Sequence, residues 1–176
     1  MSDTSQYISE VGEILAGLKK IGIQPILVGG MALVTLGSRR VTRDFDFVIS
    51  NPEENCEKML ELFYKKGLQL ASRLNENKEI TVTIDNPKIA SIRLRLDAPQ
   101  SAYFLNPKTG LRIDLLFDFP LAASELISRA KKTKIQSCIF YIASAQDLLR
   151  LKKIAKKHRK LSTDSEDIAF LEKLQN

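Results

Sequence analysis

The hydrophobic period of this chain changes repeatedly between that of a helix and that of a strand, and the segments are joined without long linkers. Apolar residues at helical spacing predict a first helix over residues 5–20. The apolar run 26–28 follows as a short buried strand, and Gly29-Gly30 then leads into a short helix over 31–36. Such alternation is typical of an α/β or α+β domain that is built on a mixed sheet.

The remaining elements are predicted from the same two periods. Helical spacing predicts further helices over residues 53–66, 122–132, 144–157 and 163–174. Apolar or alternating runs predict strands over residues 45–49, 79–84, 89–96 and 111–117, and a small hairpin at 135 and 138–142. Asp85-Asn86-Pro87 has turn chemistry, so the strands on either side of it are expected to pair. We expect a core over residues 1–143 and a C-terminal helical segment over 144–176 that packs on it.

The composition fits a single globular domain. The chain has 176 residues, of which 44% are apolar and 27% are charged, so it can bury one sizeable core. The formal net charge is +6, and a basic balance favours anionic partners such as nucleotides, RNA or DNA. A moderate net charge also serves solubility alone, and this reading stays open.

The sequence predicts a cytoplasmic protein that does not enter a membrane. The N-terminus has no basic region followed by an apolar stretch, as a signal peptide would. No apolar run approaches the roughly 18 residues that a membrane span needs. Cys56 and Cys138 are far apart in apolar segments, which suits a reducing compartment and argues against a disulfide framework or a zinc site.

Asp44 and Asp46 form the first candidate site. Residues two apart on a strand face the same side, so both carboxylates project together while Phe45 and Phe47 point into a core. Two close carboxylates repel each other, and one would stay protonated unless a cation removes the conflict. Mg²⁺ prefers oxygen ligands and suits such a pair. The alternative is two solvated aspartates at the edge of a sheet.

Gly29-Gly30 and the segment before Asp44 form the second candidate site. Glycines at the end of a strand let a phosphate approach the backbone, and the start of a helix offers free N–H donors. The segment 38–43 carries three arginines and two hydroxyl residues, which could hold triphosphate oxygens. The alternatives are a tight turn for the glycines and a solvated basic loop for Arg39 and Arg43.

Asp114 is the candidate for a third carboxylate. It lies on the polar face of an otherwise apolar strand, together with Arg112, and a polar residue there needs a partner. If this strand neighbours the strand of Asp46, the three aspartates can share a metal, as in two-metal catalysis. Asp97 and Asp118 are rivals for this role.

The order of these motifs resembles that of the polymerase-β-like nucleotidyltransferase superfamily. The order is Gly29-Gly30, a short helix, Arg40-x-Thr42-x-Asp44-x-Asp46 and the later Asp114. The match covers roughly residues 24–118. Within this superfamily the chain looks most like the small abortive-infection toxin-type nucleotidyltransferases. The matching features are the Gly-Gly start, the segment Asp147 to Lys153, Lys160 and the stretch 164–168.

The resemblance implies a fold and a chemistry. The fold is a mixed sheet with helices mainly on one side, and the chemistry is transfer of a nucleoside monophosphate from a nucleoside triphosphate. It implies that Asp44, Asp46 and Asp114 would bind Mg²⁺ or Mn²⁺, with Asp114 helping to deprotonate the acceptor hydroxyl. It further implies nucleotide contacts from Gly29, Gly30, Arg40, Thr42 and Lys152. The small hydroxyl residue that usually follows the first glycine is absent, so one side-chain contact to phosphate is lost at Gly30.

A basic run extends from Lys152 to Lys160 and includes His158, the only histidine of the chain. It is either the solvated face of a packed helix or a positive wall beside the nucleotide or an RNA acceptor. Three functions therefore stay open. The first is a toxin-like enzyme that acts on tRNA or a protein and is paired with an antitoxin. The second is an adenylyltransferase of a small molecule such as an antibiotic, and the third is a nucleotide-binding regulatory module without turnover.

Overall fold

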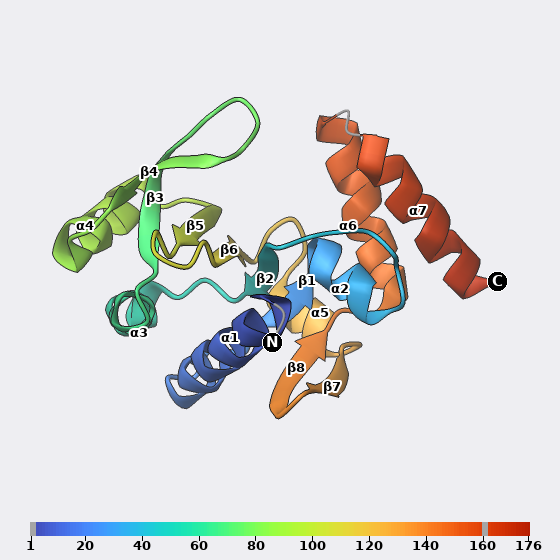
Figure 1. Cartoon of the computed structure of the whole chain (residues 1–176), viewed down its shortest axis with the longest axis horizontal. Coiled ribbons are helices and arrows are strands. Elements are labelled where there is room, and N and C mark those ends of the chain that lie inside the picture. Colours follow the sequence, from blue (N-terminus) through green and yellow to red (C-terminus); the bar gives the residue numbers. More distant parts are fainter. Residues whose placement is uncertain (1–2, 160–161) are drawn as a thin grey trace.

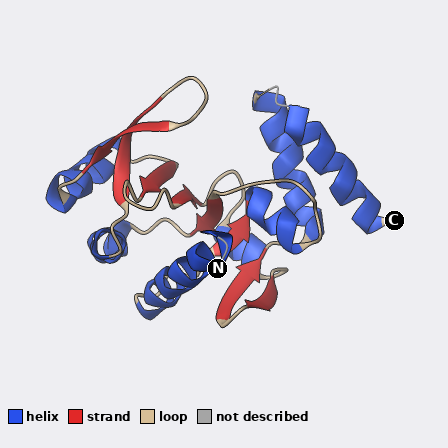
Figure 2. Cartoon of the chain, viewed as in Figure 1, coloured by secondary structure: helices blue, strands red, loops and turns tan. Residues whose placement is uncertain are grey.

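A mixed sheet forms the centre of the protein, as a computed structural model that describes residues 3–159 and 162–176 shows (Figure 2). Within this part of the chain the sheet has eight strands in the order β4-β3-β5-β6-β2-β1-β8-β7. The β2–β6 and β1–β8 pairs are parallel, and the other neighbours are antiparallel. The mixed sheet that the sequence predicts is therefore confirmed.

The elements have the following bounds. The helices are α1 (Asp3–Lys20), α2 (Gly29–Thr35), η1 (Glu53–Asn55), α3 (Cys56–Lys65), α4 (Pro87–Asp97), α5 (Ala123–Ile127), α6 (Ala145–His158) and α7 (Ser162–Gln175). The strands are β1 (Ile26–Val28), β2 (Phe45–Ile49), β3 (Gln69–Leu74), β4 (Ile80–Ile84), β5 (Ser101–Leu105), β6 (Arg112–Phe117), β7 (Lys131–Ile135) and β8 (Cys138–Ile142).

The register of β2 and β6 places the two candidate aspartates side by side. The strands run parallel, and Asp46 is the Cα partner of Asp114. Neighbouring partners on parallel strands project to the same face of a sheet, so both carboxylates emerge on one side. On the other side, Phe45 and Phe47 are fully buried in the core, as their alternation with the aspartates predicts.

The core lies between the sheet and the helices α1 and α3, which lie side by side (Figure 1). Helix α1 contributes Val11, Ile14 and Leu18, which recur at helical spacing and are buried. Helix α3 inserts Phe63, whose ring centroid lies 4.4 Å from that of Phe104 on β5. This packing fixes the central strands that carry the candidate site.

The predicted strand over 89–96 is wrong, because this segment is the helix α4. The side chain of Asn86 accepts hydrogen bonds from the backbone N–H groups of Lys88 and Ile89, at 2.9 and 3.4 Å. Pro87 then occupies the first turn, where its missing N–H costs nothing. Asn86-Pro87 therefore caps a helix rather than turning a hairpin, and Ile92 on the exposed face of α4 produces the misleading alternation.

Two strands were not predicted, and one helix is shorter than predicted. The actual partner of β4 is β3, and β5 lies between β3 and β6. Helix α5 ends at Ile127 rather than near residue 132, because β7 already begins at Lys131. The small hairpin at the end of the sheet is confirmed as β7–β8.

The C-terminal helices α6 and α7 pack against each other at one side of the sheet (Figure 1). The hydroxyl of Ser144 accepts a hydrogen bond from the N–H of Asp147 at 3.1 Å, so the predicted N-cap of α6 is confirmed. Lys160 lies outside the described residues. Both cysteines are free, and none of the described helices combines the length and apolar character that crossing a bilayer requires.

Candidate active site

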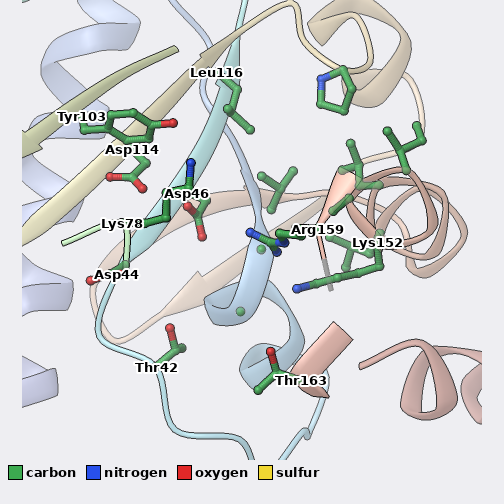
Figure 3. A pocket seen from close by; sticks show the side chains of 18 of the residues that line it. Thr42, Asp44, Asp46, Lys78, Tyr103, Asp114, Leu116, Lys152, Arg159 and Thr163 are labelled. Carbon is green, nitrogen blue, oxygen red and sulfur yellow. The ribbon is translucent and has the colours of Figure 1, made fainter. Parts of the chain in front are cut away.

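A cavity of about 600 Å³ lies between the sheet and the C-terminal helices, which is a common size for a small-molecule site. Lys78, Tyr103 and Asp114 lie on one wall, and Lys152, Arg159 and Thr163 lie across from them (Figure 3). The residues for which the resemblance implies a metal or nucleotide role all line this cavity, namely Gly29, Gly30, Arg40, Thr42, Asp44, Asp46, Asp114 and Lys152. Arg39 and Arg43 of the predicted basic segment are not among its lining residues. Residues far apart in the chain are thus brought to one place.

Gly29 lies directly against Asp46 at the floor of the cavity. Its φ of +68° is in the left-handed region, which favours glycine. A Cβ atom on Gly29 would lie 2.8 Å from Cγ of Asp46 and closer still to Oδ2. The backbone conformation and the approach of the carboxylate therefore both require glycine at this position.

The carboxylate of Asp46 is uncompensated in the described part of the protein. No hydrogen bond or ion pair reaches it from residues 3–159 or 162–176. Burial, followed by the negative charges of Asp114 and Asp44, raises the pKa of Asp46 to about 7. Lys152 and Arg112 oppose this rise from a distance. The site is therefore short of positive charge at this carboxylate.

Asp114 is in the opposite situation, because Arg112 holds both of its oxygens. Nε of Arg112 lies 2.8 Å from Oδ1, and Nη2 lies 2.9 Å from Oδ2. Burial raises the pKa of Asp114, and the hydrogen bonds and charge of Arg112 only partly offset this. Each carboxylate oxygen keeps a second lone pair, so Asp114 can still accept a further ligand.

Asp44 precedes β2 and faces the same cavity, with its carboxylate turned away from Asp46 in Figure 3. Among the described residues, no three Asp, Glu, His or Cys side chains are arranged closely enough to hold a metal ion. The three aspartates therefore share a cavity without forming a finished ligand set. The rivals lie elsewhere: Asp97 pairs with Arg93 on α4, and Asp118 accepts the N–H of Ala123 at the start of α5.

The cations across the cavity are held by two buried carboxylates of α7. Asp167 forms ion pairs with Arg40 and, at 2.8 Å, with Nζ of Lys152. Asp164 is fully buried and accepts two hydrogen bonds from Arg159, at 3.0 and 3.1 Å. Burial alone would raise the pKa of Asp164, but Arg159 and Lys152 outweigh it and lower the pKa. Three cations thus share two anions, which leaves an excess positive charge facing Asp46.

Arg40 is packed against the second glycine. A Cβ atom on Gly30 would lie 2.9 Å from Cζ and 3.0 Å from Nε of the Arg40 side chain. This Nε is buried and has no hydrogen-bond partner among the described residues. The absence of a side chain at Gly30 therefore makes room for a guanidinium group with an unused donor.

Several lining residues were not predicted from the sequence. Arg112 appeared only as the strand companion of Asp114, although its spacing of two residues already places it on the same face. Tyr103 lies on a strand that was not predicted. Cζ of Arg112 lies 5.4 Å from the centroid of the Tyr103 ring. Lys78 lies at the tip of the β3–β4 hairpin, and no local signal links this tip to the cavity.

Comparison with solved structures identifies the fold. The lincosamide antibiotic adenylyltransferase LnuA aligns over 93% of this chain and 95% of its own, with 13% identity and a TM-score of 0.57. The antibiotic-resistance factor ANT(2'')-Ia aligns over 99% and 86%, with 12% identity and a TM-score of 0.61. A nucleotidyltransferase-like protein from Paracoccidioides brasiliensis aligns over 98% and 77%, with 17% identity and a TM-score of 0.61.

The chain therefore has the nucleotidyltransferase fold, as the sequence predicts. Identities this low establish the fold and leave the reaction to be argued from the site. No protein-family model matches the chain, and no curated protein sequence matches it at a significant level.

Proposed function

We propose that this protein is a metal-dependent nucleotidyltransferase, which moves a nucleoside monophosphate from a nucleoside triphosphate to an acceptor hydroxyl. The observation that carries the proposal is the uncompensated carboxylate of Asp46, which lies against the positive-φ Gly29 and faces the cations of Arg40 and Lys152. A metal–triphosphate complex has the matching charges, because the cation would meet Asp46 and the anion would meet Arg40 and Lys152.

The donor set fits a divalent cation. Asp44, Asp46 and Asp114 offer the hard oxygen ligands that Mg²⁺ or Mn²⁺ takes, and Asp46 lacks any other partner among the described residues. A bound ion supplies Lewis-acid polarisation of the phosphates and lowers the repulsion between the carboxylates. All three side chains face the cavity, and a bound ion would have to draw them closer together, because no three of the described side chains are arranged to hold an ion.

The triphosphate would lie along Gly29-Gly30, Arg40, Thr42 and Lys152. Arg40 and Lys152 both line the cavity, and Lys152 would neutralise charge that develops on the leaving pyrophosphate. The acceptor oxygen attacks the α-phosphorus as the bond to the bridging oxygen of the β-phosphate breaks, and pyrophosphate leaves. The proton of the acceptor hydroxyl passes to Asp114, whose raised pKa suits a proton acceptor.

We propose RNA or a protein as the acceptor, in the manner of the abortive-infection toxin type, with an antitoxin as partner. His158 and Arg159, at the end of α6, line the cavity, and Lys156 and Lys157 lie in the last turn of the same helix. This basic end supports a polyanionic acceptor. We also propose residues 1–143 as the catalytic core and 144–176 as a helical segment that closes the cavity. The second candidate is an antibiotic adenylyltransferase, which the likeness to LnuA and ANT(2'')-Ia supports. The third candidate is a nucleotide-binding module without turnover. The ion pair of Arg112 with Asp114 supports it, because this pair occupies the carboxylate that would otherwise act on the acceptor.

The test is transfer of label. Each α-labelled nucleoside triphosphate is incubated with the protein, Mg²⁺ and either total RNA, total protein or a panel of lincosamides and aminoglycosides. We expect label on one acceptor class, and no label with Asp46→Ala or without the divalent ion. Asp97→Asn is the matched control, because Asp97 is exposed on α4 away from the cavity. Transfer that survives Asp46→Ala would refute the proposal, and nucleotide binding without any transfer would favour the module.

A further inference from the structure

The guanidinium of Arg112 makes contacts in three directions at once. Two of its nitrogens bind the oxygens of Asp114, and Nη1 donates to the backbone carbonyl of Lys78 at 2.7 Å. Its Cζ also lies 5.4 Å from the centroid of the Tyr103 ring, within the range of a cation–π contact. The side chain is only 14% exposed, so this group is a fixed part of the cavity wall rather than a solvated cation.

The carbonyl that Arg112 binds belongs to the tip of the β3–β4 hairpin, residues 75–79, which stands across the cavity from α6 (Figure 1). The tip is organised by Asn75, whose Oδ1 accepts the N–H groups of Asn77 and Glu79 at 3.0 and 2.9 Å. Lys78 adopts a φ of +64°, and its carbonyl accepts the hydrogen bond from Arg112. The tip is therefore internally ordered, and the side chain of Arg112 links it to β6.

We infer that Arg112 is a positioning residue, which orients the carboxylate of Asp114 and locks the hairpin tip as the acceptor-side wall of the cavity. The inference rests on the proposed function, in which Asp114 receives the proton of the acceptor hydroxyl. A planar fork with five donors can satisfy Asp114 and the Lys78 carbonyl together, whereas an ammonium group acts as a point charge. Arg112 thereby couples the position of the acceptor, through the hairpin tip, to the orientation of the Asp114 carboxylate.

This role separates acceptor chemistry from nucleotide binding. Asp46, Gly29, Arg40 and Lys152 lie on the nucleotide side of the cavity and make no hydrogen bond with Arg112 in the described part of the chain. Loss of Arg112 should therefore change nucleotide affinity less than transfer, because on that side of the cavity only the distant charge of Arg112 acts on Asp46. It should lower the rate of transfer, because a carboxylate that is misplaced by a fraction of an ångström to 1 Å is a poor proton acceptor.

The test compares Arg112→Gln and Arg112→Lys with Arg93→Gln, an exposed arginine on α4 that serves as control. Hydrogen exchange reports on the amides of residues 75–79, and labelled transfer in the assay described above gives kcat and the nucleotide KM. We expect tip exchange on the order of tenfold faster in both Arg112 variants. We expect kcat on the order of tenfold lower with the KM for nucleotide within about twofold. A role of simple charge neutralisation would instead be rescued by lysine.

A second variant keeps the inference testable if Arg112→Gln folds poorly. Asn75→Ala loosens the tip without touching Asp114, so its effect on kcat should be non-additive with that of Arg112→Lys. If the wild type transfers label and the Arg112 variants match Arg93→Gln in tip exchange and kcat, the positioning role is overturned alone. A wild-type protein that neither binds nucleotide nor transfers label would overturn the proposed function, and the positioning role would fall with it.

Discussion

Replacing Gly29 with alanine should damage the protein through two separable costs. The first is the backbone cost, since a φ of +68° is left-handed and costs an L-residue about 1–2 kcal/mol. The second is steric, because the new Cβ would lie 2.8 Å from Cγ of Asp46 and closer to Oδ2. Forcing an atom into a packed place costs typically about 1–3 kcal/mol. We therefore expect Gly29→Ala to lower the free energy of unfolding by about 2–5 kcal/mol.

Gly22→Ala is the matched control for this prediction. Gly22 has a φ of +84°, and nothing lies within 4 Å of the Cβ that alanine would add. It should therefore show the backbone cost alone, about 1–2 kcal/mol. The two variants differ only in whether the added methyl group meets Asp46, so their difference measures the steric term.

The assay is urea denaturation of four proteins that form a double-mutant cycle: wild type, Gly29→Ala, Asp46→Ala and the double variant. In the Asp46→Ala background Oδ2 and Cγ are gone and only Cβ of residue 46 remains, 3.0 Å from the added methyl group. Most of the steric cost should therefore disappear, and Gly29→Ala should cost about 1–2 kcal/mol. The coupling between the two positions should then be about 1–3 kcal/mol. Equal costs of Gly29→Ala in both backgrounds, or a cost equal to that of Gly22→Ala, would refute the claim that Gly29 is required by Asp46.

Three further outcomes are expected. The pKa of Asp46 is about 7 in the folded state and about 4 in the unfolded state, so between these pH values the folded state binds the extra proton. Urea titrations should therefore show the free energy of unfolding falling as the pH rises from about 4 to 7, by at most about 4 kcal/mol. Asp46→Asn should flatten this slope. Asp167→Ala leaves Arg40 without its buried partner and leaves Lys152 with only the longer pair to Asp164 at 3.5 Å, and it should cost about 3 kcal/mol or more in urea unfolding. Glu172→Ala breaks the exposed pair with Lys153 and should cost under about 0.5 kcal/mol. Asn86→Ala removes the cap of α4 and should lower the free energy of unfolding by about 1 kcal/mol, and a strand at 89–96 would predict no such loss.

Much of the candidate site could be predicted because its residues obey local rules. The alternation of Asp44, Phe45 and Asp46 determines which side chains share a face, and the structure buries Phe45 as expected. The pairing of β2 with β6 could be stated only as a condition, because register depends on the whole sheet. Once the strands are neighbours, the parallel register that aligns Asp46 with Asp114 brings the two carboxylates together.

The misassigned segment shows where local rules conflict. Residues 89–96 alternate apolar and charged side chains, which favours a strand. The same residues also follow Asn86-Pro87, which is a helix start as much as a turn. The cap prevails because burial of Ala90, Ser91 and Leu94 gives the helix a face to pack, and these positions recur at helical rather than strand spacing.

Contacts between distant segments could not be read from the sequence. Asp164 and Asp167 bind Arg40, Lys152 and Arg159 only because α7 returns alongside α6 and the segment before β2 reaches them. The contact of Arg112 with the carbonyl of Lys78 likewise joins residues 34 positions apart. Side-chain spacing within one element carries no information about such partners.

Asp46 and Asp114 lie side by side in the sheet but have different electrostatic surroundings. Asp46 and Asp114 sit at matched positions on parallel strands, so geometry alone does not distinguish them. Their partners do, because Arg112 neutralises Asp114 while Asp46 lies against Gly29 with no donor among the described residues. An incoming cation gains more at the uncompensated carboxylate, since there it displaces only a proton. Under the proposed function, the metal should therefore bind first at Asp46, while Asp114, held in place by Arg112, completes the ligand set and receives the proton of the acceptor hydroxyl.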